Sequence, residues 1–143
     1  MSLRILLVDD DQASRDVLRE MILRLGHQVV GEVSDGSDAV GLYRFRQSRP
    51  DLVLMDIDMP FLDGLNTITQ IKKIHQNARI IVVTGTNTPV EEIKNVGAMG
   101  VLRKPCHPET VQKILTQFES LFRTTLKTDL HKEPSVPTPK VKK

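Results

Sequence analysis

The amino-acid sequence predicts an α/β protein, a doubly wound parallel sheet of five strands in the order 2-1-3-4-5 with five helices on both faces. Short, almost unbroken apolar runs alternate with segments whose apolar residues recur at helical spacing. This strict alternation favours parallel strands joined by helical crossovers. The length supports one such domain, because 143 residues are too few for two ordinary domains. The strand order is taken by analogy with doubly wound folds, since periodicity alone does not show it.

Five segments have the apolar character of strands that are buried on both faces. The run RILLV at 4–8 stops at Asp9, and the run RIIVV at 79–83 stops at Thr84. The second strand is weaker, because Gly31 interrupts it. In chain order the predicted strands cover 4–8, 28–33, 52–55, 79–83 and 101–102.

Helical spacing predicts a helix after each strand. The first helix places an apolar stripe from Val17 to Leu25 on one face, and Gly26 suits the C′ position that ends it. Arg49-Pro50 breaks the chain before the third strand. The remaining helices are expected over 37–47, 66–75, 89–96 and 109–122.

The net charge of +2 is unevenly divided along the chain. Residues 123–143 carry +4, so residues 1–122 carry −2. The basic segment holds three prolines and scattered lysines with few apolar residues, a composition that cannot bury enough surface to become ordered. We therefore expect a folded domain over 1–122 and a basic, Pro-containing, disordered tail over 123–143. Nucleic acid is not an expected partner of this chain alone.

Composition excludes several classes of function. No apolar run approaches the roughly 18 residues of a membrane span, and the first residues do not resemble a signal peptide, so we expect a cytoplasmic protein without membrane contact. The single cysteine, Cys106, excludes an internal disulfide and a cysteine-based zinc site. Aromatic residues make up 3%, which argues against base stacking as a main function. His27, His75 and His131 lack metal-ligand spacing and are expected at the surface.

Polar residues stand where the predicted strands end. In a parallel sheet these ends open onto one edge, where doubly wound folds bind ligands. Taken singly, each such residue is an ordinary turn or helix-cap residue. Taken together they form one candidate pocket. The residues so placed are Asp9, Asp10, Asp11, Asp56, Asp58, Thr84 and Lys104.

The three aspartates Asp9, Asp10 and Asp56 require a compensating charge. Two carboxylates about 4 Å apart repel by about 4 kcal/mol at an effective dielectric near 20. Three in one pocket need protonation or a cation, and hard carboxylate oxygens suit Mg²⁺. A carboxylate nucleophile, a metal, and donors such as Thr84 and Lys104 are what an aspartyl phosphate needs.

The sequence resembles the receiver domain of two-component response regulators over about residues 3–122. Four motifs in order carry the resemblance: Asp9-Asp10 after ILLV, LVLMDIDMPFLDG at 52–64, IIVVTG at 80–85 and GVLRKP at 100–105. The resemblance implies a chemotaxis-type, flavodoxin-like fold and a phosphorylation-activated signalling switch. Such a protein has at most self-phosphorylation and self-dephosphorylation activity.

The resemblance also implies roles for the residues of the candidate pocket. Asp56 is the expected phosphoacceptor and one of the Mg²⁺ ligands. Asp10 is expected to hold Mg²⁺ directly, Asp9 largely through water, and Asp58 through its backbone carbonyl.

Two donors complete the expected site. Thr84 is expected to bond one phosphoryl oxygen and Lys104 to pair with another, while Gly85 leaves room for the phosphoryl group. The Lys104–Pro105 peptide bond is expected to be cis.

The implied partners are proteins. The phosphoryl donor is expected to be a phosphohistidine on a sensor histidine kinase or a phosphotransfer protein, or a small acyl phosphate. The added charge of roughly −1.5 to −2 is expected to bias the face made by 89–96, 101–102 and 109–122 toward binding an unidentified downstream protein. Receivers usually carry Tyr, Phe or His three residues before the lysine, where this chain has Val101. This departure predicts a shifted output mechanism or a different output surface.

Three alternatives are weighed beside this interpretation. The chain is either a switch without an output domain or the receiver part of a longer regulator, with 123–143 as a linker. A different class of function, that of an enzyme, is also considered. Asp56-Ile57-Asp58 resembles the nucleophile and acid pair of haloacid-dehalogenase-type phosphatases. Pro60 departs from that motif, and a cap region is missing. A flavodoxin-like FMN carrier is weaker still, because no phosphate-binding loop follows the first strand.

Overall fold

The computed structural model describes residues 2–59 and 63–132. It contains one parallel five-stranded sheet in the order β2-β1-β3-β4-β5, which confirms the predicted fold class. The strands are β1 (Arg4–Val8), β2 (Gln28–Val33), β3 (Leu52–Asp56), β4 (Ile80–Thr84) and β5 (Gly100–Arg103).

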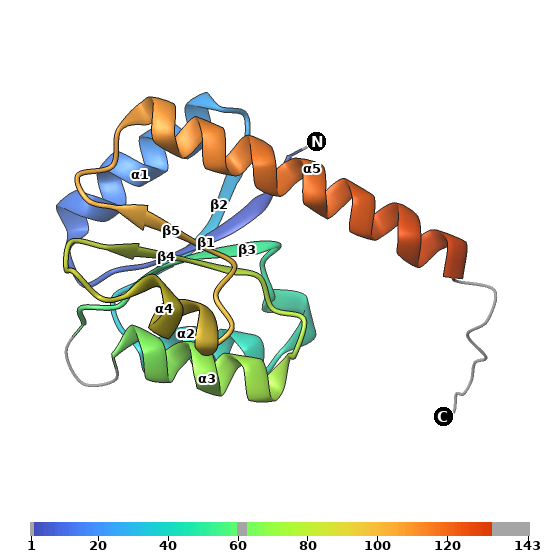
Figure 1. The fold of residues 1–143 in the computed structure, drawn as a ribbon, viewed down its shortest axis with the longest axis horizontal. Coiled ribbons are helices and arrows are strands. Elements are labelled where there is room, and N and C mark those ends of the chain that lie inside the picture. The colour runs from blue at the N-terminus through green and yellow to red at the C-terminus, as the bar shows by residue number, and fades with distance from the viewer. Residues whose placement is uncertain (1, 60–62, 133–143) are drawn as a thin grey trace.

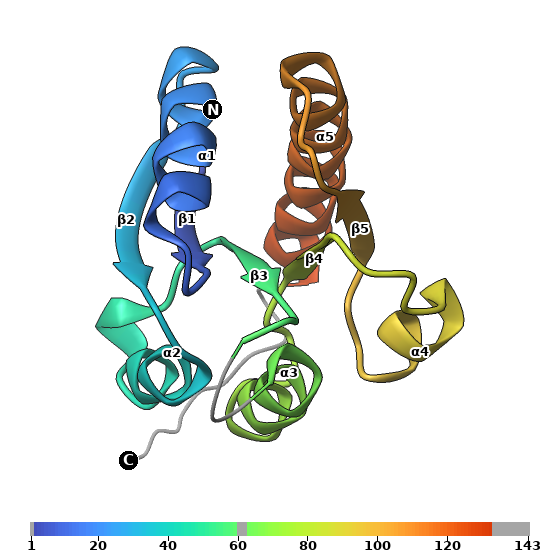
Figure 2. The same cartoon turned by 90° about the vertical axis from the view of Figure 1, so that its left-hand side faces the viewer.

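Helices cover both faces of the sheet. Helices α1 and α5 lie on one face, and α2, α3 and α4 lie on the other (Figure 2). The helices are α1 (Gln12–Arg24), α2 (Gly36–Tyr43), α3 (Gly64–Ile74), α4 (Val90–Asn95) and α5 (Pro108–Lys132), with a short 3₁₀ turn, η1, at Arg46–Ser48.

The unbroken apolar strands follow from this layering. In β1, Ile5 and Leu7 pack into the core on the α1 and α5 side, whereas Leu6 and Val8 pack into the core on the opposite side. Successive side chains of a strand point to opposite faces, so a strand covered on both sides must be apolar at every position. The same reasoning applies to β3 and β4, in which every residue is buried.

Most predicted boundaries lie within two residues of the observed ones, but α2 ends earlier than expected. It ends at Tyr43, its last buried residue, and the predicted continuation to residue 47 is wrong. Arg44, Phe45 and Arg46 are exposed. A short helix depends on tertiary packing, and even the apolar side chain among these residues, Phe45, is 65% exposed and lies outside the core.

The last helix is longer than expected. Helix α5 continues to Lys132, so the predicted disorder is wrong for residues 123–132, whereas residues 133–143 lie outside the described part (Figure 1). No Pro or Gly interrupts residues 109–133, and Arg123 pairs with Glu119 one turn earlier. The guanidinium of Arg79 lies 4.8 Å from the centre of the Phe122 ring, which holds this helix against the body. No described helix is long and apolar enough to cross a membrane.

Of the three histidines expected at the surface, one is buried and one is half-buried. His27 is buried, and its Nδ1 accepts a hydrogen bond of 3.1 Å from the Leu3 backbone N–H. His75 is half-buried and stacks on Tyr43 with ring centres 6.1 Å apart. Both histidines are brought to these positions by residues distant in the sequence, which spacing alone does not reveal. The side chain of His131 lies outside the described part.

Candidate functional site

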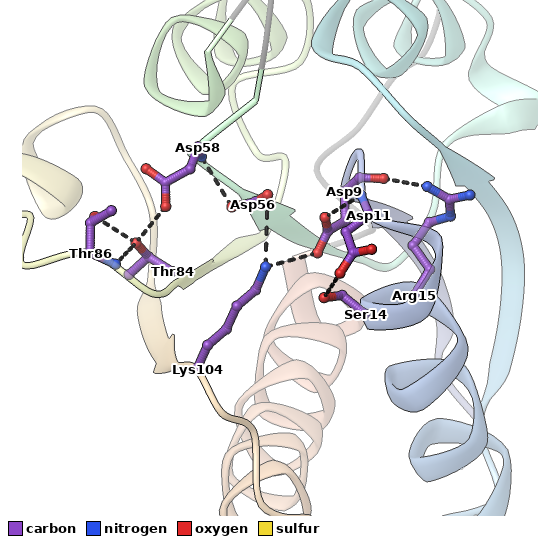
Figure 3. A network of polar contacts seen from close by, with 9 residues as sticks. All are labelled: Asp9, Asp11, Ser14, Arg15, Asp56, Asp58, Thr84, Thr86 and Lys104. Carbon is purple, nitrogen blue, oxygen red and sulfur yellow. Dashed lines mark hydrogen bonds and ion pairs between the residues drawn. The ribbon is translucent and has the colours of Figure 1, made fainter.

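The candidate site lies at the carboxyl edge of the sheet. Asp9 directly follows β1, Asp56 ends β3 and Thr84 ends β4, while Lys104 follows β5. Their side chains converge in front of the strand ends (Figure 3). The chain leaves β1 toward β2 on one side and returns to β3 on the other. This is the topological switch point, where doubly wound sheets bind ligands.

The structure brings three carboxylates together, as the sequence predicts. Ligand oxygens of Asp9, Asp10 and Asp56 all lie within 4.8 Å of one another. Asp9 and Asp56 are buried, at 2% and 3% exposure, while Asp10 is exposed. Oxygen donors of this kind fit Mg²⁺, which needs only one or two carboxylates and keeps several waters. The exposed Asp10 leaves this cluster open to solvent.

Burial controls the protonation of Asp56. Loss of solvation raises the pKa of the Asp56 carboxyl to about 6, and the charge of Asp9 adds to this effect. Two contacts act in the opposite direction. The Asp58 backbone N–H donates a 3.0 Å hydrogen bond to Asp56 Oδ1, and Lys104 brings a positive charge.

Lys104 is the cation that the carboxylates share within the described part of the chain. Its Nζ lies 3.1 Å from Asp9 Oδ2 and 3.8 Å from Asp56 Oδ2. Although burial acts to lower the pKa of Lys104, the charges of Asp56 and Asp9 raise it overall. The ammonium group therefore stays charged at neutral pH. The Lys104–Pro105 peptide bond that follows is cis, as expected.

Thr84 is buried, and its hydroxyl is already engaged. Its Oγ1 lies 3.3 Å from Asp58 Oδ2 and 2.9 Å from Thr86 Oγ1, and it accepts a 3.0 Å hydrogen bond from the Thr86 backbone N–H. The Asp58 side chain thus faces Thr84, whereas its backbone N–H faces Asp56. The predicted use of the Asp58 carbonyl as a metal ligand stays a prediction.

Three features of the site were not expected from the sequence. The Arg15 guanidinium donates to the backbone carbonyl of Asp9, and the Asp11 N–H donates a 2.9 Å hydrogen bond to Asp9 Oδ1. Gly64 lies against the end of β3, where an added Cβ would come within 2.5 Å of the Asp56 carbonyl oxygen. Asp63 caps α3 by accepting a hydrogen bond from the Asn66 N–H, but the close approach at Gly64 depends on the tertiary structure.

Comparison with known proteins identifies what the chain is similar to. A model of the response regulator receiver domain matches residues 5–116. The chain is 38% identical over 119 residues to the chemotaxis protein CheY of Thermotoga maritima, a match that covers 82% of this chain and 98% of that protein. It is 36% identical to a probable C4-dicarboxylate response regulator, DctR, of Halalkalibacterium halodurans, covering 85% of this chain but 53% of that protein.

A solved structure gives a further likeness. The chain superimposes with a TM-score of 0.73 and 28% identity on a chain from the CheX–CheY–BeF₃–Mg²⁺ complex of Borrelia burgdorferi. The match covers 83% of this chain and 88% of that chain.

Proposed function

Because the chain belongs to the response regulator receiver domain family, and so is a regulatory switch rather than a conventional enzyme, we propose that it is switched by a phosphoryl group accepted on Asp56. One observation carries this proposal. Asp56 is a buried carboxylate at a strand end, flanked by two acidic side chains and contacted by Lys104. The family assignment argues against the alternative of a haloacid-dehalogenase-type phosphatase.

We propose that Mg²⁺ is held by Asp9, Asp10 and Asp56, together with the backbone carbonyl of Asp58. When bound, the ion supplies positive charge to the phosphoryl oxygens. The clustering of the three carboxylates supports this assignment. The Asp9 carboxylate already accepts hydrogen bonds from Lys104 and from the Asp11 N–H. It is therefore better suited to bind the ion through a water molecule, whereas the exposed Asp10 is better suited to bind it directly.

The proposed reaction is a phosphoryl transfer to the Asp56 carboxylate. An Asp56 oxygen attacks the phosphorus of a phosphohistidine on a sensor kinase or phosphotransfer protein. The P–N bond breaks, and its electron pair stays on the donor imidazole. Lys104 is proposed to pair with one phosphoryl oxygen, and Thr84 to donate its hydroxyl to another.

The proposed output surface is the face made by α4, β5 and α5. Met99 and Leu121 are exposed there, and a shallow pocket of about 150 Å³ lies between β5 and α5. Exposed apolar side chains beside a pocket suit a protein partner. We propose that residues 1–122 form the receiver domain and that the basic segment 123–143 extends from it. The position of the stop codon in the reading frame tests whether this segment leads to a further domain.

Intact-mass spectrometry after incubation with Mg²⁺ and acetyl phosphate or phosphoramidate tests the proposal. We expect one phosphoryl group on the wild-type chain and none on Asp56→Asn. Asp16→Asn, which removes a carboxylate from the surface of α1, is the matched control and should be phosphorylated normally. Addition of EDTA should abolish the adduct. A phosphoryl group that persists on Asp56→Asn, or the lack of any adduct on the wild type, contradicts the assignment.

A further inference from the structure

A chain of three threonine hydroxyls leads from the candidate site to the surface. Thr84 Oγ1 lies 2.9 Å from Thr86 Oγ1, which lies 2.9 Å from Thr88 Oγ1. Thr84 is buried, whereas Thr86 is exposed and Thr88 half-buried in the segment between β4 and α4. The three side chains therefore form one continuous hydrogen-bonded path out of the pocket (Figure 3 shows its first two members).

The direction of these hydrogen bonds depends on Asp58. A hydroxyl has one proton to donate, and an ionised carboxylate can only accept. When Thr84 donates to Asp58 Oδ2, at 3.3 Å, Thr86 must donate to Thr84. A phosphoryl oxygen on Asp56 would compete for the same Thr84 proton. Thr84 cannot serve both acceptors with one proton, so phosphorylation must break its contact with Asp58.

Arg103 holds the outer part of this path in place from the neighbouring strand. Its guanidinium donates to the carbonyl oxygens of Thr86, at 2.7 Å, and Thr88, at 3.2 Å. Arg103 is the register partner of Thr84 in the β4–β5 pair. Its side chain is exposed, and no carboxylate lies within ion-pair distance of it in the described part of the chain. Within the described residues, its polar partners are therefore the two backbone carbonyls.

Val101 cannot form the polar contact with the segment after Thr84 that Arg103 forms. Residues 101 and 103 lie two apart on β5 and so project from the same face of the strand. Val101 is half-buried, packs against the core below α4, and has no polar group to donate. The polar connection between β5 and the segment after Thr84 is made by Arg103 instead.

We propose that Arg103 is the positioning residue that carries the state of Thr84 to the exposed face of β5. This inference rests on the proposed function, because phosphorylation of Asp56 is what draws the Thr84 hydroxyl away from Asp58. The chain of hydroxyls then loses the hydrogen bond from Thr84 to Asp58. As a result the carbonyls of Thr86 and Thr88 shift, and the Arg103 guanidinium that donates to them changes its position on the surface.

Amide NMR spectra of the full chain, recorded before and after phosphorylation with acetyl phosphate and Mg²⁺, test this role. In the wild type we expect shifts at Thr84 and Gly85 that continue into β5 and α4. In Arg103→Ala and Arg103→Lys we expect Asp56 to be phosphorylated as in the wild type, with the shifts at residues 84 and 85 retained and those in β5 and α4 largely lost. Lysine keeps the charge, but its ammonium group lacks the planar guanidinium geometry that donates to two carbonyls at once.

Val101→Ala is the matched control, because it alters the same face of the same strand. It should keep the wild-type pattern of shifts in β5 and α4. In addition, amide exchange at residues 86–88 should become about tenfold faster in unphosphorylated Arg103→Ala, as expected from losing hydrogen bonds to a charged group.

The outcomes separate this inference from the proposed function. If the wild type forms no phosphoryl adduct, the proposed function fails and this inference fails with it. If the adduct forms on Arg103→Ala and the shifts in β5 and α4 are unchanged, the role of Arg103 is wrong while the phosphoacceptor assignment stands.

Discussion

At the residue scale, the central feature is the confinement of negative charge around Asp56. Two carboxylates, those of Asp9 and Asp56, are almost fully buried. Among the residues that the structure describes, Lys104 is the cation within ion-pair distance of both. One positive charge cannot balance two buried carboxylates and the neighbouring Asp10. The site therefore reduces the stability of the fold in order to hold groups that attract a cation and a phosphoryl group.

This cost predicts a pH-dependent stability difference between the wild type and Asp56→Asn in EDTA. The folded-state pKa of Asp56 is about 6, against 3.8 in its ordinary state. The native state thus holds more protons than the unfolded state between these values, and stability falls as the pH rises through that window. At pH 8 the variant should be more stable by on the order of 2 to 3 kcal/mol. This excess should shrink as the pH falls from about 6 to about 4 and be nearly absent below that.

Urea unfolding at pH 3.5 to 8 measures this difference. Asp16→Asn again serves as the control, since removing a surface carboxylate paired with Arg19 should change stability by less than about 1 kcal/mol. A gap between Asp56→Asn and the wild type that stays constant over this range would show that burial of the Asp56 charge is not its source.

At the scale of elements, the junction between β3 and α3 fixes how close the helix comes to the phosphoacceptor. A Cβ at Gly64 would lie 2.4 Å from the Ile57 Cα and 2.5 Å from the Asp56 carbonyl oxygen, both of which are backbone atoms. Backbone cannot move aside as a flexible side chain can. The start of α3 is therefore set by the lack of a side chain at this position.

Gly64→Ala should consequently destabilise the fold by about 1 to 3 kcal/mol, as overpacking of a rigid site does. Gly41→Ala is the matched control, because it lies inside α2 and an added Cβ there meets nothing within 4 Å. That substitution should stabilise the protein by about 0.4 to 1 kcal/mol, since alanine loses less backbone entropy in a helix. Thermal and urea unfolding of both variants measure the contrast, and equal effects would contradict the steric argument.

Helix α5 extends beyond the body of the domain to which it belongs. Its buried residues Val111, Leu115 and Phe118 pack on the sheet, and Phe122 is covered by Arg79. Beyond them the helix continues past the body in Figure 1. No Pro or Gly stops it before residue 134, and a helix already begun adds further residues at little cost.

At the scale of the whole molecule, the site exists only when the sheet is assembled. Its residues come from the ends of four strands, with Asp9 and Lys104 separated by 95 positions in the chain. A ligand that needs several of these ends binds the native state and not the unfolded chain. Such a ligand must stabilise the entire domain.

Magnesium ions should therefore raise the midpoint of thermal unfolding of the wild type. The gain should approach about 2.7 kcal/mol when the ion concentration is a hundred times its dissociation constant. Asp10→Asn should lose most of this gain, because it removes the exposed ligand of the cluster, whereas Asp16→Asn should keep it. Differential scanning calorimetry with Mg²⁺ and with EDTA measures the effect, and an equal gain in Asp10→Asn would exclude that residue as a ligand.

The fold and most of the candidate site were predictable from local patterns. Strands buried on both faces must be apolar at every position, so their ends are visible in the sequence. Asp9, Asp56 and Thr84 each lie at such an end, and a parallel sheet brings those ends to one edge. The convergence of Asp9, Asp10, Asp56 and Lys104 thus followed from pattern and topology together.

The remaining features depend on contacts between residues far apart in the chain. The burial of His27 is decided by Leu3, and the close approach at Gly64 is decided by the path of β3. The hydrogen bonds from Arg103 to the carbonyls of Thr86 and Thr88 join β5 to the segment that follows β4. The sequence by itself determined which residues could meet at the carboxyl edge, because periodicity and strand ends are local properties. Only the tertiary structure decided how those residues are linked to the surface, because hydrogen bonds between strands depend on distances that no local pattern contains.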